Sequence, residues 1–201
     1  SGHDGIHTFY LEKGAKVRYV EKHYGEGDPG TTGKRLMNPT TVVHLKEDAQ
    51  MVMETSQIAG IDDTLRITKA DLADRAKLEI HDSIMTTGDQ NADAEFTADL
   101  NGEDCSCNIV SRTVAKGNSK QHYTSTLNGN NRCAGHTECD SILMDQAYVL
   151  ATPQLSAATM EASLIHEAAI GKIAGEQLIK LMTLGLTEEE AEEQIISGFL
   201  K

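Results

Sequence analysis

The sequence contains no Trp, and aromatic residues make up only 4% of its 201 residues. A globular core of this size usually holds more rings, so the scarcity favours a repetitive core of stacked small and β-branched side chains. Basic residues are also scarce, with 18 Lys and Arg against 31 Asp and Glu and a net charge of −13. A nucleic-acid surface needs clustered Lys and Arg, so we expect no nucleic-acid partner. No apolar run approaches the roughly 20 residues that span a bilayer, so we expect no membrane partner either.

Familiar nucleotide and hydrolase signatures are missing as well. No P-loop, G-x-S-x-G, H-E-x-x-H or dinucleotide fingerprint occurs, which leaves the chain without a recognisable nucleotide site. The four cysteines do not suggest a disulfide framework, because Cys105 and Cys107 are two apart on a strand-like run and face the same way. Reduced thiols of a cytoplasmic protein, or metal ligands, fit better. The first strand-like segment starts without a lead-in, so we expect a fragment of a longer protein.

What the sequence does contain is an internal repeat. Five leucines recur at intervals of 27, 28, 27 and 28 residues, and each is followed by a short polar turn and a second strand-like segment. They are Leu45, Leu72, Leu100, Leu127 and Leu155. An earlier copy centres on Leu11, and the Gly/Pro-rich loop from Gly25 to Arg35 accounts for its longer spacing.

Apolar residues alternate with period two inside each copy, as in Ala76, Leu78 and Ile80, which is typical of strands. A unit of two short strands cannot bury its apolar face alone, so neighbouring units must stack. The pattern predicts a mainly β protein, most simply a parallel β-helix over residues 1–170. A sandwich of hairpins is the alternative, and the near-constant period disfavours it.

Residues 171–201 change character and predict a short C-terminal helical segment. Ile173, Leu178, Leu181 and Met182 share one helical face, and Gly185 is placed to end that helix. Thr187 and Glu190 then form a capping box for a second helix, whose apolar face carries Ala191, Ile195 and Phe199. The segment is either an end cap of the solenoid or a hairpin that docks a partner.

Two of the cysteines, Cys133 and Cys139, are six apart and face the same way on an unbroken strand, with His136 and Glu138 opposite. A bulge at Gly135 would break this arrangement. The spacing lacks the paired knuckles of zinc sites, so small buried hydrophobes are the plain interpretation.

Glu167 follows His166 among apolar neighbours, where a carboxylate is costly to bury unless it is paired, protonated or metal-bound. Glu167 is therefore the best functional candidate from local chemistry. The alternative is that it turns outward or caps the coming helix.

The segments CDSILM (139–144), SLIHEAAIGKIAGEQL (163–178) and LGLTEEEAEEQIISGFLK (184–201) resemble the SufB/SufD family, the scaffolds of the SUF iron–sulfur cluster assembly system. GIHTFYLEKGAKV (5–17), SRTVAKGNS (111–119) and NGNNRCAGHTECD (128–140) resemble its short SufB-like members from anaerobic bacteria and archaea. The motif reads H-E-A-A-I where larger scaffolds read H-E-A-T-T. The N-terminal region of the family is not matched.

The resemblance implies a right-handed parallel β-helix and a non-enzymatic scaffold. It implies a nascent iron–sulfur cluster, expected to be [4Fe–4S], held at a dimer interface of two copies or of this chain and a paralogue. A cysteine desulfurase or other donor would supply the sulfur. Residues 171–201 would dock a SufC-like ABC ATPase. A SufD-like support without a cluster is the alternative, and a polysaccharide-acting β-helix enzyme is disfavoured because aromatic residues are few and scattered.

By motif, Cys139 and Glu167 match the family residues implicated in cluster assembly. A thiolate is a soft ligand for iron and sulfide, and a carboxylate is a labile oxygen ligand. His166 and Cys133 are weaker candidates, and Cys105 and Cys107 have no assigned role.

The period itself adds an expectation that does not depend on the family. Cys139 and Glu167 are 28 residues apart, close to one repeat. Stacked strands lie about 4.8 Å apart, so we expect the two side chains to approach one metal ion from adjacent rungs.

Overall fold

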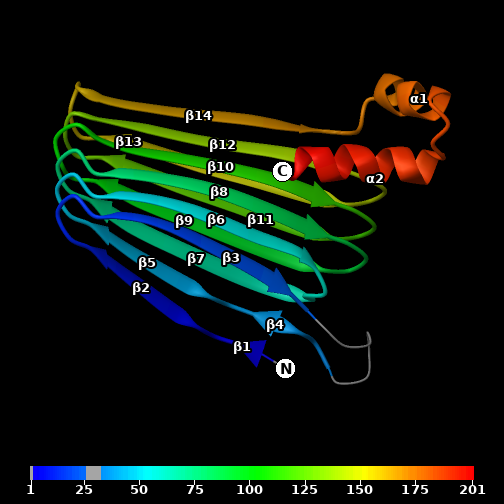
Figure 1. The fold of residues 1–201 in the computed structure, drawn as a ribbon, viewed down its shortest axis with the longest axis horizontal. Coiled ribbons are helices and arrows are strands. Elements are labelled where there is room, and N and C mark those ends of the chain that lie inside the picture. Colours follow the sequence, from blue (N-terminus) through cyan, green and yellow to red (C-terminus); the bar gives the residue numbers. More distant parts are fainter. Residues whose placement is uncertain (1, 26–32) are drawn as a thin grey trace.

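The computed structural model describes residues 2–25 and 33–201, and within them the chain forms a parallel β-solenoid with two sheets (Figure 1). Sheet A contains β1 (Gly2–His3), β2 (Ile6–Leu11), β4 (Leu36–Met37), β5 (Thr40–Leu45), β7 (Asp63–Leu72), β9 (Asn91–Leu100), β11 (Lys120–Gly129) and β13 (Tyr148–Ala157). Sheet B contains β3 (Lys16–Tyr24), β6 (Gln50–Ala59), β8 (Lys77–Thr86), β10 (Cys105–Ala115), β12 (Cys133–Leu143) and β14 (Ala162–Gly171). The helices α1 (Gly175–Thr183) and α2 (Glu188–Phe199) follow. The predicted fold class is confirmed.

The core lies between the sheets and is built from every second residue of each strand. Ala76, Leu78 and Ile80 all face inward and are almost fully buried, as the alternation predicts. Small residues fill much of this core, and Phe96 and Tyr123 are the rings at its centre. The predicted Gly-rich loop over residues 25–35 lies largely outside the described residues.

The repeat is less regular than the leucines suggest. Leu72 pairs with Leu100 across β7 and β9, but Leu100 pairs with Gly129 rather than with Leu127. The leucines therefore do not form one continuous column between β9 and β11, because the spacing of stacked residues there is longer than that of the leucines. Sheet B varies in the same way, since Lys77 pairs with Ser106 whereas Cys105 pairs with Cys133.

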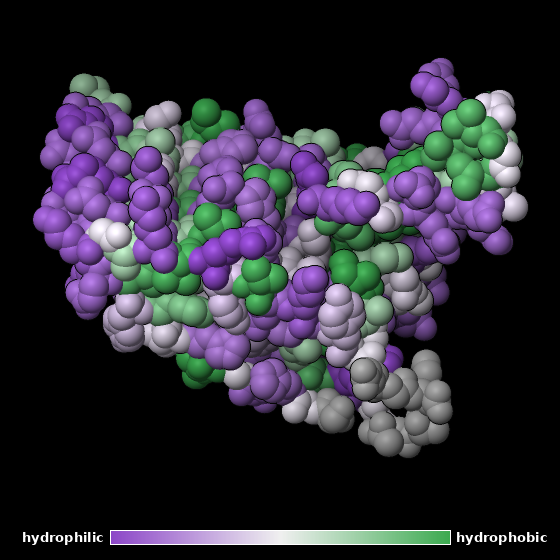
Figure 2. Space-filling view, in the orientation of Figure 1, coloured by the Kyte–Doolittle hydropathy of each residue, from purple (hydrophilic) through white to green (hydrophobic). Residues whose placement is uncertain are grey.

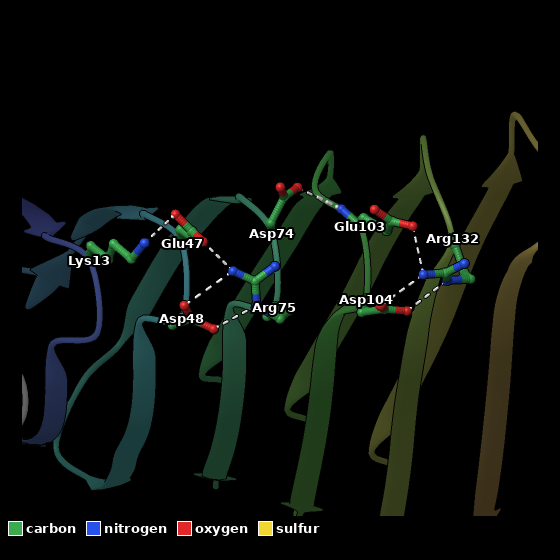
Figure 3. Close-up of polar contacts among 8 residues, drawn as sticks. All are labelled: Lys13, Glu47, Asp48, Asp74, Arg75, Glu103, Asp104 and Arg132. Atoms are coloured by element: carbon green, nitrogen blue, oxygen red, sulfur yellow. Dashed lines mark hydrogen bonds and ion pairs between the residues drawn. The ribbon is translucent and has the colours of Figure 1, made fainter.

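The turns between sheets A and B carry a column of charges of alternating sign (Figure 3). Asp48, Arg75, Asp104 and Arg132 occupy corresponding turns, and each Arg binds the acid of the turn before it. Arg75 also bonds Glu47, which in turn binds Lys13 at 2.9 Å. These ion pairs connect the stacked turns along one edge of the solenoid.

The C-terminal end of the solenoid is uncovered within the described residues. β13 pairs only with β11, and β14 only with β12, so each leaves one row of backbone donors and acceptors without a strand partner. Leu155 and Ile170 stack on buried residues of the previous turn but are 42% and 44% exposed. A free edge beside an uncovered core is a surface to which another chain can add strands.

The two helices follow β14 and lie beside sheet B near its upper edge (Figure 1). The predicted caps are confirmed: Gly185 has a φ of 99°, and Thr187 and Glu190 exchange both bonds of a capping box. The C-cap residue of α2, Leu200, contacts the sheet, since the Ser83 hydroxyl donates to its carbonyl at 3.0 Å. Neither helix is long and apolar enough to cross a membrane.

Candidate functional site

Cys139 lies in the middle of β12 and faces the core, where it is fully buried. Burial raises the pKa of its thiol to about 11, so the thiol is protonated at neutral pH. The Ser141 hydroxyl lies 3.8 Å from the sulfur and can hydrogen-bond to it. Among the described strands only β14 lies beyond β12 in sheet B, and Ala168 is the residue that stacks on Cys139. The sulfur is thus one strand away from the uncovered end.

Cys139 also stands near the end of a polar column inside the solenoid. Going down sheet B, it stacks on Ser111, then Asp82, then Thr55, then Glu21. The Thr55 hydroxyl donates to Asp82 at 2.5 Å, and Arg66 of sheet A binds the same carboxylate at 2.8 Å. One column of the interior is therefore polar, which the apolar periodicity of the sequence did not reveal.

Glu167 faces away from Cys139, which corrects the expectation that one repeat brings them together. The register between β12 and β14 pairs Glu167 with Glu138 and Cys139 with Ala168. The spacing of stacked residues is 29 here, and a shift of one residue moves a side chain to the other face of a sheet. Glu167 is exposed on the outer face of sheet B.

His136, Glu138 and Glu167 form a cluster on that outer face. One ligand atom from each lies within 4.8 Å of the other two. His136 Nε2 is 3.3 Å from a Glu167 oxygen, and its Nδ1 is 2.7 Å from Asn108 Oδ1 on the neighbouring strand. Burial raises the pKa of Glu138, and the nearby Asp140 adds to this effect. The alternation along β12 predicts that His136 and Glu138 face away from the cysteines. That Glu167 lies beside them could not be predicted, because this depends on the register between β12 and β14.

His166 and Cys133 both face the interior. His166 stacks on Thr137 close to the uncovered end, and its Nδ1 is buried without a hydrogen-bond partner among the described residues. Burial lowers the pKa of this imidazole, and His136 adds to the effect. Cys133 stacks on Cys105 at the start of the strands, and the β10–β12 register runs through Gly135 without a bulge, so the two cysteines of β12 face the same way.

No other thiol is within ligand range of Cys139 in one chain. All four cysteines are free and buried. Cys133 is six residues away on the same strand, which corresponds to about 20 Å at about 3.3 Å per residue. Cys107 and Cys105 are four and six positions away in the register of the adjacent strand. A cluster that takes four thiolates would therefore need ligands from beyond a single protomer or other ligand types.

Comparisons with known proteins give a consistent result. Residues 3–199 match a family model described as "SUF system FeS cluster assembly, SufBD core domain". An iron–sulfur cluster assembly SufBD family protein of Methanothermobacter thermautotrophicus is 30% identical over 98% of this chain and 48% of its own length. One from Methanocaldococcus jannaschii is 32% identical over 94% of this chain and 60% of its own. The iron–sulfur cluster assembly protein SufB of Bacillus subtilis is 35% identical over 48% of the chain and 22% of its own. The chain thus spans about half the length of the first two relatives.

Proposed function

The chain belongs to the SufBD family of iron–sulfur cluster assembly proteins, and from this premise we propose that it is a non-enzymatic scaffold for a nascent cluster. Cys139 is the sulfur acceptor and first iron ligand in this proposal. The observation that carries it is the position of the thiol, at the end of the interior polar column and one strand from the uncovered end of the solenoid. The cluster, [4Fe–4S] or a smaller precursor, is cargo that the scaffold later releases.

The buried thiol becomes a ligand only when iron or sulfur displaces its proton, because metal binding requires a thiolate. With a pKa of about 11, this exchange is unfavourable while Cys139 stays enclosed. We infer that loading needs the end of the solenoid to open at β14. A cysteine desulfurase or another donor would deliver the sulfur at that stage.

A second protomer supplies the missing ligands in this proposal. One chain offers a single thiol at the site, whereas clusters usually take four. The free edges of β13 and β14, with Leu155 and Ile170 exposed beside them, support a dimer that forms there from two copies or from this chain and a paralogue.

The C-terminal helices are the proposed contact with a SufC-like ABC ATPase, which would provide the nucleotide chemistry that the sequence lacks. α1 has no buried residue, and Ile179 and Leu184 are 64% and 76% exposed. Apolar surface gathers on this helical segment, at the upper right of Figure 2. Movement of the ATPase would then be transmitted through α2, which contacts sheet B beside β8 and β10.

One observation favours a second function. Burial and a raised thiol pKa are equally expected if Cys139 has only a structural role. The chain would then be a SufD-like support that binds the ATPase without holding a cluster.

Anaerobic reconstitution with iron and sulfide tests the scaffold proposal. We expect a cluster absorption band in the wild-type chain that is lost in Cys139→Ala and retained in Cys107→Ala, which removes an equally buried thiol. Circular dichroism of each variant checks that the solenoid is intact. Equal absorption in all three proteins refutes the assignment of Cys139, and ATPase binding without iron uptake by the wild type supports the SufD-like alternative.

A further inference from the structure

The cluster of His136, Glu138 and Glu167 lies on the opposite side of sheet B from Cys139, and each ring nitrogen of His136 faces an oxygen of a neighbouring side chain. Asn108 Oδ1 can only accept, so the 2.7 Å contact with His136 Nδ1 requires a proton on that nitrogen. In the neutral ring Nε2 is then an acceptor. It faces a Glu167 oxygen at 3.3 Å, which is also an acceptor. Either a proton on Nε2 or a metal ion must therefore lie between them.

The two carboxylates of the cluster also call for a nearby cation. Glu138 and Glu167 are direct partners in the register of β12 and β14 and point to the same side. Like charges directly opposite each other on parallel strands are unfavourable. A proton on His136 Nε2 would satisfy Glu167 alone, whereas a metal ion coordinated by all three residues would also offset Glu138.

We propose that His136 Nε2 and one oxygen each of Glu138 and Glu167 bind a single divalent first-row metal ion, separate from the thiol site. The three ligand atoms lie within 4.8 Å of one another, so small side-chain rotations bring them onto one ion. Two carboxylates and one neutral imidazole carry a charge of −2, which matches a divalent cation. This donor set suits Fe(II), Mn(II) or Zn(II) rather than the soft metals that thiolates select.

The surroundings also fit such a site. Asn108 fixes the tautomer and orientation of the His136 ring, which is the usual task of a residue behind a metal-binding histidine. Asn108 and His136 line a groove of about 470 Å³ on the outer face of sheet B, which gives a hydrated ion access from solvent. The flanking acid Asp140 is the register partner of Arg112, a cation on the neighbouring strand β10.

The identity of the ion in the cell is the part that rests on the proposed function. If the chain assembles iron–sulfur clusters, the ion is ferrous iron, held on the outer face before it reaches the sulfur. The site itself depends only on the three side chains. The existence of the site and the identity of the ion in the cell are therefore tested with different probes.

The test is anaerobic titration of the full chain with Fe(II), and with Co(II) as a spectroscopic probe whose absorption reports its ligands. We expect one ion per chain in the wild type. His136→Ala and Glu138→Gln should each raise the dissociation constant at least about tenfold, and Asn108→Ala about 10–100-fold. Glu138→Gln keeps the shape of the side chain, so it remains informative if His136→Ala folds poorly.

The chain offers a matched control in His81, which pairs with Glu79 at 2.8 Å on the same face of sheet B but outside any such three-residue cluster among the described residues. His81→Ala should bind as the wild type does. Cys139→Ala should also keep the ion even though it loses the reconstituted cluster. Unchanged binding in both His136→Ala and Glu138→Gln would overturn the site, and so would loss of the ion in Cys139→Ala.

Discussion

The ion pair between Arg66 and Asp82 crosses the interior from sheet A to sheet B. The side chains are 6% and 0% exposed and meet at 2.8 Å. Removing one partner leaves a buried charge without compensation, so we expect Arg66→Met to lower the free energy of unfolding by about 3–5 kcal/mol. Urea denaturation measures the change.

The double variant Arg66→Met/Asp82→Leu is the control for this prediction, because it removes the pair together. Replacing a buried ion pair by apolar residues is often nearly neutral, so it should recover much of the loss. If the double variant is as unstable as the single one, the charge of Asp82 is not the cause.

The buried thiol of Cys107 makes stability depend on alkaline pH. Burial raises its pKa from 9.0 to about 12. Above pH 9 the unfolded chain therefore releases a proton that the folded chain keeps, and stability falls as pH rises, by about 1.4 kcal/mol per pH unit for one such thiol. Chemical denaturation at pH 8 and at pH 10.5 should show a shallower decline in Cys107→Ala than in the wild type. An identical decline in both would contradict the prediction.

At this scale the sequence predicted which residues are functional candidates but not which of them meet. The motif around Cys139 and the awkward setting of Glu167 identified both as candidates. Their faces could not be predicted, because the average period of 27–28 residues hides a local step of 29 that turns Glu167 outward. The same local step places Glu167 on the face of sheet B that carries His136.

The helix α1 is the element whose role depends most on a partner. Its residues are all at least partly exposed, so packing within the chain explains little of its apolar face. Leu184 is the C-cap residue of α1. We expect Leu184→Gln to weaken co-purification with a SufC-like ATPase by an order of magnitude or more, since a few residues buried at an interface carry most of its affinity.

Ile6 provides a matched control for this experiment. It is an apolar residue with the same 76% exposure as Leu184, and it lies in β2 at the other end of the solenoid. Ile6→Gln should leave co-purification unchanged. Equal weakening by both changes, or by neither, would argue against docking through α1.

The individual elements were largely predictable because their signals are local. Period-two alternation gives the strands, and Gly185 with the Thr187–Glu190 capping box gives the ends of the helices. The polar column that includes Thr55 and Asp82 was not predictable, since it needs the register of several strands together.

For the whole molecule, the uncovered end predicts a dimer. We expect Ile170→Lys to shift the chain from dimer to monomer in sedimentation experiments, because it places a charge on the exposed core beside the free edge of β14. Val20→Lys is the matched control, with a similar 46% exposure in β3 at the opposite end. A monomeric wild type, or a dimer that tolerates Ile170→Lys, would be inconsistent with this interface.

The charges along the turn edge also fix the order in which the turns can occur. Asp48 and Asp104 are separated by the turn that carries Arg75 (Figure 3). A chain shortened by that one repeat would stack Asp48 directly beside Asp104, two like charges with no cation between them. Turns of this solenoid are therefore not interchangeable modules, although Asp48, Arg75 and Asp104 share the same left-handed backbone conformation. Shortening or lengthening such a chain by duplication should succeed most readily in steps of two repeats, which preserve the alternation of sign.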